Sequence, residues 1–251
     1  SHIVLNAHKI NAGELITLDN KNKDFFFFEK KDVRSVMGAL VYLVKTRLPE
    51  YIGASSFEIQ VLTPMRKGEL GVEHLNEVLQ YYLNPASESK KEKEGRTGVF
   101  REGDKVMQVK NNYKLEWKIT NAKGFSIEEG LGVFNGDMGI IKQINTYSER
   151  ITVVFDENRE AEYPFSSLDE LELAYAITIH KSQGSEYPAV VLPLLSGPPI
   201  LCNRNLLYTA ITRAQKCVAI AGRQSMVEQM IHNETEQKRY SGLNDCLKEG
   251  L

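Results

Sequence analysis

Continuous apolar runs alternate with amphipathic stretches over the first third of the chain. The pattern predicts a helix at 1–10, a strand at 24–29, a helix at 33–48, a strand at 57–62 and a helix at 72–82. Asp32 stands directly before the second helix, where its carboxylate can cap free backbone N–H groups. This order of strands and helices is typical of an α/β domain with a parallel sheet.

The strand at 24–29 contains four consecutive phenylalanines, Phe25 to Phe28. Exposed aromatic rings could stack on nucleic-acid bases. A strand buried on both faces of a parallel sheet needs the same continuous apolar run. We favour the second interpretation and expect these rings in the core.

The pattern changes after Pro85. Residues 86–98 are charged and small, which predicts an exposed connection. From 103 to 167 the apolar runs shorten and predict strands at 105–109, 133–134, 138–144, 150–155 and 160–163. Turns are expected at Asn135–Gly136, extending to Asp137, and at Asp156–Asn158. A small β-barrel fits this pattern, with Trp117 either packed in it or free to stack on bases.

The α/β pattern then resumes. Strands are expected at 172–179, 189–192 and 217–220, a helix at 205–214, and a polar helical tail after Arg223. The barrel therefore interrupts the α/β domain. We expect a first α/β segment at 1–102, the barrel at 103–167, and a second α/β segment with the tail at 168–251.

Composition narrows the class of protein. The chain has 251 residues, 42% of them hydrophobic and 25% charged, with a net charge of −2. No apolar run approaches the roughly 18 residues of a membrane helix, and no signal pattern is visible, so we expect a cytoplasmic protein that does not contact membranes. Neither Cys202, Cys217 and Cys246 nor the five histidines have ligand spacing, so no disulfide or metal site is expected. The near-neutral charge argues against tight duplex binding by counterion release, but it does not exclude a protein that must repeatedly release a nucleic-acid strand and so needs few phosphate contacts.

Two segments carry candidate chemistry. Residues 172–187 read Leu-Glu-Leu-Ala-Tyr-Ala-Ile-Thr-Ile-His-Lys-Ser-Gln-Gly-Ser-Glu, and residues 208–214 read Tyr-Thr-Ala-Ile-Thr-Arg-Ala. In ATP hydrolysis, negative charge spreads over the γ-phosphoryl oxygens, so a guanidinium delivered from another domain stabilises the transition state. Arg213 is our candidate for that group. The alternative is a surface arginine that neutralises carbonyl dipoles at a helix C-terminus.

The loop after residue 178 offers polar groups where parallel sheets place ligands. Donors come from Thr178, His180, Lys181 and Ser182, and Gly184 lets a ligand approach the backbone. His180 could instead be structural, and Glu186 could be a plain surface carboxylate. Thr63, followed by Pro64, could donate to a phosphate or only form a strand-to-helix turn. The expected barrel offers three further candidates, Asn111, Asn112 and Tyr113. They could contact a nucleic-acid strand or only form a turn at a domain junction.

No Gly-x-x-x-x-Gly-Lys-[Ser/Thr] phosphate loop occurs in the chain. The nearest imitation runs from Gly98 to Lys105, but it places Asp104 where the loop needs its lysine. The phosphate cradle is therefore expected outside this chain.

The segments at 1–13, 59–65, 71–76, 103–108, 111–113 and 133–137, with the two above, are similar in order and spacing to the C-terminal part of RecD-like superfamily 1 helicases. The likeness is greatest to the RecD2 (RecD/TraA) branch and covers nearly all of residues 1–223. It implies a RecA-like motor domain, 2A, interrupted by an SH3-like barrel, 2B, and 5′-to-3′ travel on single-stranded DNA. The family carries a Phe-Arg-Gln segment just before the position of Ser1, so the chain resembles an excised piece.

The resemblance also implies roles for residues. Arg213 would reach the γ-phosphate of ATP, and Gly184 and Glu186 would approach the nucleotide. Thr178 and His180 would contact the DNA backbone, with Lys181, Ser182, Thr63, Pro64 and the segment 111–113 also on the DNA side. ATP and Mg²⁺ would bind mainly to the missing domain 1A, so this chain alone, expected to be a monomer, would hydrolyse no ATP. The alternatives are a nucleic-acid-binding module without catalysis and the helicase part of a conjugative relaxase.

Overall fold

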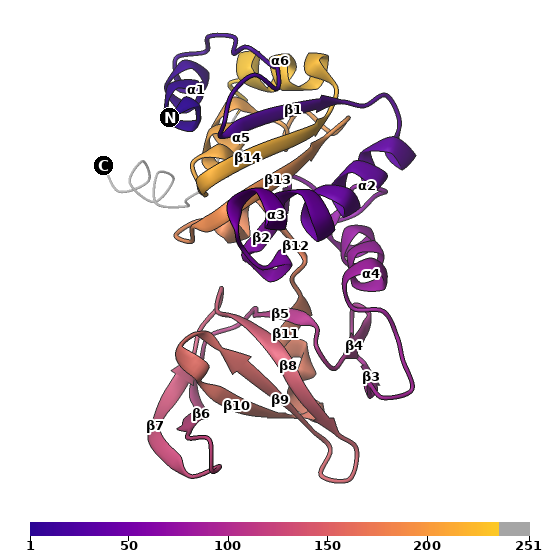
Figure 1. Cartoon of the computed structure of the whole chain (residues 1–251), viewed down its shortest axis with the longest axis vertical. Helices are drawn as coiled ribbons and strands as arrows, with labels where there is room; N and C mark the ends of the chain where they lie inside the picture. The colour runs from indigo at the N-terminus through magenta and orange to yellow at the C-terminus, as the bar shows by residue number, and fades with distance from the viewer. Residues whose placement is uncertain (236–251) are drawn as a thin grey trace, which may run out of the picture.

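The computed structural model describes residues 1–235, which form two large β-sheets of different kinds. One sheet has five parallel strands and the other has seven antiparallel strands. Figure 1 shows the parallel sheet and its helices in one lobe and the antiparallel sheet in the other. Within residues 1–235, no helix has the length and apolar character that a membrane span requires. Cys246 and the end of the expected C-terminal tail lie outside the described residues.

The parallel sheet is buried on both faces. Its strands, in spatial order, are β1 (Phe25–Glu29), β14 (Ala214–Gly222), β13 (Tyr187–Leu194), β2 (Ile59–Thr63) and β12 (Ala176–Thr178). Successive side chains point to opposite faces, so Val190 and Val218 join one core while Ala189 and Ala219 join the other. This two-sided burial explains the continuous apolar runs in the sequence.

The phenylalanine run is one of these strands, as expected. Phe25 and Phe27 are 0% and 6% exposed, and Phe26 packs edge-on against Tyr51 with ring centroids 5.5 Å apart. Strand β1 pairs in parallel with β14 along its whole length. The rings therefore belong to the core and are not a base-stacking surface.

Helices cover both faces of the parallel sheet. One core contains side chains of α1 (His2–Asn11), α5 (Arg204–Ile211) and α6 (Gln224–His232). The other core contains side chains of α2 (Val33–Tyr42), α3 (Leu48–Ile52) and α4 (Val72–Leu83). Asp32 caps α2 as predicted, accepting a 2.9 Å hydrogen bond from the backbone N of Ser35. The single helix expected at 33–48 is two helices, joined by a π-helical turn at Leu43–Arg47.

The antiparallel sheet lies between β2 and β12 in the chain. Its strands, in spatial order, are β11 (Leu171–Leu173), β5 (Lys105–Gln108), β8 (Met138–Asn145), β9 (Arg150–Phe155), β10 (Glu160–Pro164), β6 (Asn112–Thr120) and β7 (Ser126–Val133). Strand β6 was missed from the sequence, and the short strand expected at 133–134 is the end of the longer β7. The expected α/β fold with a small β insertion is confirmed.

Two connections differ from the sequence predictions. The single strand expected at 172–179 is wrong, because β11 belongs to the antiparallel sheet and β12 to the parallel one. The chain changes sheet at Ala174 and Tyr175 between them. The exposed connection at 86–98 contains half of a hairpin, in which β3 (Glu92–Glu94) pairs with β4 (Val99–Arg101).

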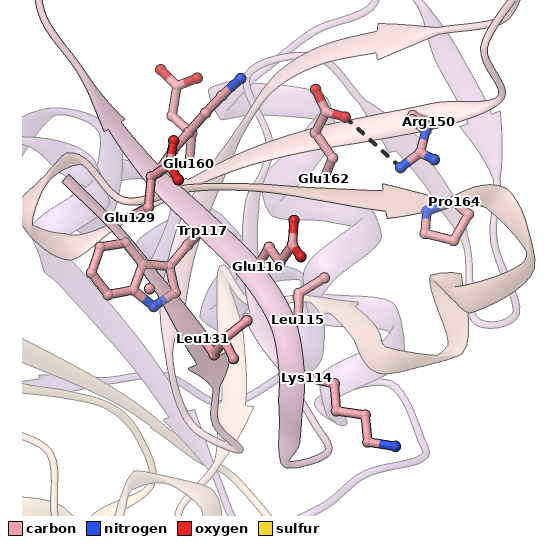
Figure 2. Close-up of a pocket in the computed structure, with 12 residues that line it drawn as sticks. Lys114, Leu115, Glu116, Trp117, Glu129, Leu131, Arg150, Glu160, Glu162 and Pro164 are labelled. Carbon is pink, nitrogen blue, oxygen red and sulfur yellow. Dashed lines mark ion pairs between the residues drawn. The ribbon is translucent and has the colours of Figure 1, made fainter. Parts of the chain in front are cut away.

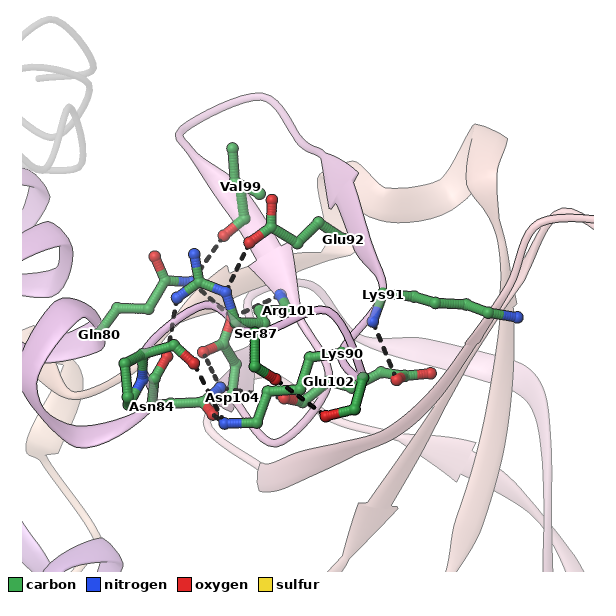
Figure 3. Close-up of polar contacts among 12 residues, drawn as sticks. Gln80, Asn84, Ser87, Lys90, Lys91, Glu92, Val99, Arg101, Glu102 and Asp104 are labelled. Carbon is green, nitrogen blue, oxygen red and sulfur yellow. Dashed lines mark hydrogen bonds and ion pairs between the residues drawn. The ribbon is translucent and has the colours of Figure 1, made fainter.

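A buried polar cluster holds the start of the antiparallel sheet against α4 (Figure 3). The carboxylate of Asp104 is fully buried and accepts hydrogen bonds from Gln80 Nε2 at 2.7 Å and Asn84 Nδ2 at 2.8 Å. The hydroxyl of Tyr175 and the backbone N of Arg101 donate to the same carboxylate, at 2.8 and 2.7 Å. The segment from Gly98 to Lys105, whose spacing resembles a phosphate loop, therefore contains one strand of a hairpin and the buried carboxylate that links the sheet to α4.

Lys105 makes a second connection between the sheets. Its Nζ donates to the backbone O of Phe57 at 2.7 Å and to Gln60 Oε1 at 2.8 Å. Gln60, on β2, in turn donates to the backbone O of Ala174 at 3.1 Å. Burial lowers the pKa of Lys105 to about 7. Near neutral pH this amine is therefore protonated only in part, and no carboxylate within residues 1–235 bonds to it.

Candidate functional site

The expected site residues at the parallel sheet fall into two groups at opposite edges. Thr63 and Thr178 end β2 and β12 and stand in register with each other. Tyr187 and Ala214 begin β13 and β14 and are likewise in register. Because all five strands are parallel, the first pair lies at the carboxyl edge and the second at the amino edge. The loop at 179–186 connects the two edges.

The hydroxyl groups of Thr63 and Ser182 are occupied inside the fold. Thr63 is fully buried, and its Oγ1 donates to the backbone O of Leu70 at 2.7 Å. Ser182 is also fully buried, and its Oγ donates to the backbone O of Ile179 at 2.6 Å. Pro64 is buried beside Thr63. A DNA contact through either hydroxyl would require one of these bonds to break.

Other groups at the carboxyl edge are accessible. His180 is exposed and Lys181 is half-buried, both within the 3-10 turn His180–Ser182. Within residues 1–235, neither side chain has a hydrogen-bond or ion-pair partner. Thr178 is half-buried, and its Oγ1 accepts a weak 3.4 Å bond from the backbone N of Lys181. The basic side chains are therefore free to contact an external acceptor.

Arg213 lies at the amino edge, between the end of α5 and the start of β14. Its Nη1 donates to the backbone O of Ser185 at 3.2 Å, and its Nη2 lies 3.4 Å from Thr212 Oγ1. Its backbone O accepts a 2.8 Å bond from the N of Tyr187. The side chain is thus held against the loop that carries Gly184 and Glu186.

The guanidinium of Arg213 has no countercharge within residues 1–235. Its Nε is buried without a hydrogen-bond partner, and no carboxylate in the described part of the chain forms an ion pair with it. The positive charge of Arg213 influences the neighbouring hydroxyl of Tyr187. Burial raises the pKa of Tyr187, whereas a hydrogen bond with Ser185 and the charge of Arg213 act to lower it. A half-buried cation without an anion is an arrangement that an incoming anion would complete.

Gly184 and Glu186 lie on the same loop. Gly184 has φ +86°, a left-handed conformation that favours glycine, although a Cβ there would meet nothing within 4 Å. Glu186 is exposed and accepts a 3.2 Å bond from Gln215 Nε2. The backbone at Gly184 is therefore open to approach from solvent.

Asn112 and Tyr113 lie on β6 of the antiparallel sheet, and Asn111 directly precedes this strand. Asn111 Oδ1 accepts a 2.9 Å bond from the N of Asn135, and Asn112 Nδ2 donates to Glu170 at 3.0 Å. Tyr113 is 67% exposed. The turn expected at Asn135–Gly136 is confirmed between β7 and β8.

Phe134 is a candidate that the sequence did not reveal. It is 41% exposed and packs against Tyr113 with ring centroids 5.5 Å apart at 68°. The two aromatic residues are 21 positions apart in the sequence, so only the pairing of β6 with β7 brings them together. Within residues 1–235, no cluster of His, Cys, Asp and Glu is arranged to hold a metal ion.

Two family models and a solved structure match this chain. The SH3 domain of ATP-dependent RecD-like DNA helicases matches residues 75–155, and the UvrD-like helicase C-terminal domain matches residues 173–221. The crystal structure of a Pif1 helicase from Bacteroides with ADP-AlF3 and single-stranded DNA aligns with a TM-score of 0.48 and 19% identity, over 98% of this chain and 53% of that one.

Two curated relatives are similar over most of the chain. The ATP-dependent RecD2 DNA helicase of Deinococcus radiodurans is 39% identical over 164 residues, which are 65% of this chain and 20% of that protein. The RecD subunit of the RecBCD enzyme of Mycolicibacterium smegmatis is 30% identical over 191 residues, which are 76% of this chain and 29% of that protein. The chain therefore spans less than a third of either relative. The resemblance inferred from the sequence is confirmed: the chain is similar to RecD-like DNA helicases, and parts of it match their SH3 domain and the UvrD-like helicase C-terminal domain.

Proposed function

We propose that the chain is the C-terminal motor part of an ATP-dependent 5′-to-3′ DNA helicase, and that Arg213 is its arginine finger. The observation that supports this role is the half-buried guanidinium without a countercharge at the rim of the parallel sheet. A γ-phosphate presented by another domain would supply the missing anion. Arginine suits the task because its planar fork holds two phosphate oxygens and keeps its charge.

The remaining roles follow the two edges of the sheet. Gly184 and Glu186, on the loop that contacts Arg213, would lie beside the nucleotide. Thr178, His180 and Lys181, at the carboxyl edge, would contact the backbone of single-stranded DNA. ATP and Mg²⁺ would be held mainly by a RecA-like domain 1A that this chain does not contain, so the chain alone would not hydrolyse ATP. We assign domain 2A to residues 1–102 and 168–251 and domain 2B to residues 103–167.

The test uses the full-length helicase. Arg213→Ala should lower DNA-stimulated ATP hydrolysis roughly a thousandfold while the affinity for single-stranded DNA stays the same. Arg213→Lys should recover little of the rate, since an ammonium cannot form the two-pronged contact. Arg34→Ala, at an exposed position on α2, is the matched control and should not change turnover. An unchanged rate in Arg213→Ala would refute the proposal.

A second candidate function, nucleic-acid binding by the antiparallel sheet alone, is favoured by the exposed pair of Tyr113 and Phe134. Deleting 103–167 would not test it cleanly, because Asp104 and Lys105 hold the two sheets together. The double variant Tyr113→Ala/Phe134→Ala removes only exposed rings. If the double variant loses all affinity for single-stranded DNA while ATP hydrolysis is unchanged, the result favours a binding module. A partial loss of affinity would favour the motor.

A further inference from the structure

The surroundings of Arg213 favour an anionic ligand, whereas a hollow of about 630 Å³ in the antiparallel sheet favours neither charge. Figure 2 shows that cations and carboxylates both line this hollow, with Arg150 paired to Glu162 at 3.8 Å. Around Arg213, by contrast, no carboxylate within residues 1–235 forms an ion pair with the guanidinium. The groups that hold this cation in place therefore decide where it can meet an anion.

Thr212 lies directly before Arg213, at the position that ends α5. Its Oγ1 donates to the backbone O of Thr209 at 3.0 Å, one turn back along the helix. A hydroxyl has a single hydrogen to donate, and its lone pairs can accept. Because that hydrogen is used within the helix, Thr212 can meet Arg213 only as an acceptor, and Arg213 Nη2 lies 3.4 Å from its Oγ1. The β-branched side chain has few rotamers and the helix bond selects one, so this acceptor keeps a fixed direction.

A second acceptor holds the other terminal nitrogen of Arg213. The backbone O of Ser185 accepts from Nη1 at 3.2 Å, and the backbone N of Ser185 donates to Ser182 O at 3.0 Å within the loop. A guanidinium has five N–H groups. These contacts use two of them and the buried Nε holds a third, which leaves one N–H on each terminal nitrogen. Such a pair forms the planar fork that binds two phosphate oxygens.

We propose that Thr212 is a positioning residue for Arg213, and that its hydroxyl directs the guanidinium so that both remaining N–H groups meet the γ-phosphate of ATP. This inference rests on the proposed role of Arg213 as the arginine finger. Thr212 touches neither the nucleotide nor DNA and acts only through the direction that it gives to Nη2. A misdirected guanidinium keeps its charge, so loss of the hydroxyl should slow hydrolysis less than loss of Arg213 does.

The test is a double-mutant cycle in the full-length protein, measured as single-turnover ATP hydrolysis in the presence of single-stranded DNA. Thr212→Val keeps the shape of the side chain but removes the acceptor. It should lower the rate roughly tenfold, the effect of one hydrogen bond to a charged group. The affinities for single-stranded DNA and for ADP, which lacks the γ-phosphate, should stay the same. In an Arg213→Ala background, Thr212→Val should have no further effect, because the hydroxyl acts only through Arg213.

Two further variants separate positioning from the stability of α5. Thr212→Ser retains the hydroxyl and should restore most of the rate. Thr209→Val is the matched control, because Thr209 Oγ1 also donates within the helix, to the backbone O of Asn205 at 2.9 Å, and forms no hydrogen bond with Arg213 among residues 1–235. This control should leave the rate unchanged. Thermal melting curves check that every variant folds.

Three outcomes would overturn the positioning role and leave the arginine finger intact. In the first, Arg213→Ala is slow but Thr212→Val hydrolyses ATP at the unaltered rate. In the second, Thr212→Val slows hydrolysis by the same factor with and without Arg213. In the third, Thr212→Ser or Thr209→Val is as slow as Thr212→Val, which would assign the loss to the fold of α5. An unchanged rate in Arg213→Ala would instead refute the finger and the positioning role together.

Discussion

The hydroxyl of Tyr175 donates a 2.8 Å hydrogen bond to the carboxylate of Asp104. Tyr175 lies where the chain leaves the antiparallel sheet for the parallel one, and Asp104 directly precedes the first strand of the antiparallel sheet. A single carboxylate therefore joins both chain crossings between the two sheets. Gln80 and Asn84 tie the same carboxylate to α4.

Replacing Asp104 should strongly destabilise the protein. All four neighbours donate to it, so Asp104→Ala leaves four buried donors without an acceptor, at a cost of about 3–5 kcal/mol. Asp104→Asn should cost nearly as much, because its amide would face donors. Neither Gln80 nor Asn84 can turn its amide over without losing the bonds to Val99 O and Glu102 O.

The control for this prediction is Tyr175→Phe, which removes one donor together with its need for an acceptor and should cost about 1 kcal/mol. The free energy of unfolding is measured by urea titration, with Trp117 emission and circular dichroism followed in parallel. Equal losses in Asp104→Asn and Tyr175→Phe would show that the carboxylate is not the centre of the junction.

Lys105 should make stability depend on pH. Its folded pKa, about 7, lies below the ordinary value of 10.5, so between these values the unfolded chain binds more protons than the folded one. The free energy of unfolding should therefore rise with pH above 7, by at most about 1.4 kcal/mol per pH unit. Below pH 7 both states are protonated and this contribution to the slope disappears.

The pH range for this measurement is bounded by the thiols. Burial raises the pKa of Cys202 to about 11 and that of Cys217 to about 12, so stability should fall once unfolded thiols ionise near 9. Urea titrations between pH 7 and about 8.5 thus isolate the lysine. The rise should be absent in Lys105→Met, which keeps the length of the side chain but cannot titrate. A rise of equal size in the variant would assign it to another group.

The sequence predicted the elements whose burial is uniform and missed those that are half exposed. The parallel strands have continuous apolar runs because helices cover both faces, and these runs could be recognised without a structure. Strand β6 alternates Leu115, Trp117 and Ile119 with charged residues, a period of two that is typical of a half-exposed strand, yet the sequence predictions include no strand there. Leu171 to Thr178 reads as one apolar run, although its two halves belong to different sheets.

The candidate site divides in the same way. The motifs proposed the loop at 179–186 and Arg213 as candidates, and the structure brings the two into contact through the bond from Arg213 Nη1 to the backbone O of Ser185. Which hydroxyls are free could not be predicted, since Thr63 and Ser182 bond to backbone oxygens that only the fold brings near. The partnership of Tyr113 with Phe134 depends on strand register, which the sequence does not state.

Gly130→Ala should disturb the antiparallel sheet more than its size suggests. The new methyl group would overlap the Trp117 ring, and the ring must move away from β7. We expect a loss of about 1–3 kcal/mol in the free energy of unfolding and a shifted Trp117 emission in the folded state. Gly38→Ala is the control. That glycine lies in α2 with nothing within 4 Å of a Cβ, so alanine should stabilise the helix by about 0.5–1 kcal/mol.

Thr63 offers a test of whether a residue in a helicase-like position acts on DNA or on the fold. Thr63→Val keeps the shape but leaves the backbone O of Leu70 without its donor, so it should cost about 1–2 kcal/mol. Thr63→Ser retains the hydroxyl and should preserve that bond while losing only a methyl group. In the full-length protein, assayed well below the melting temperature, both variants should bind single-stranded DNA as the unaltered protein does. Because the hydroxyl is buried, a structural role predicts that Thr63→Val and Thr63→Ser differ in melting temperature and not in affinity for single-stranded DNA. A tenfold weaker affinity in Thr63→Val alone, with melting temperatures that match, would instead place this hydroxyl on the DNA.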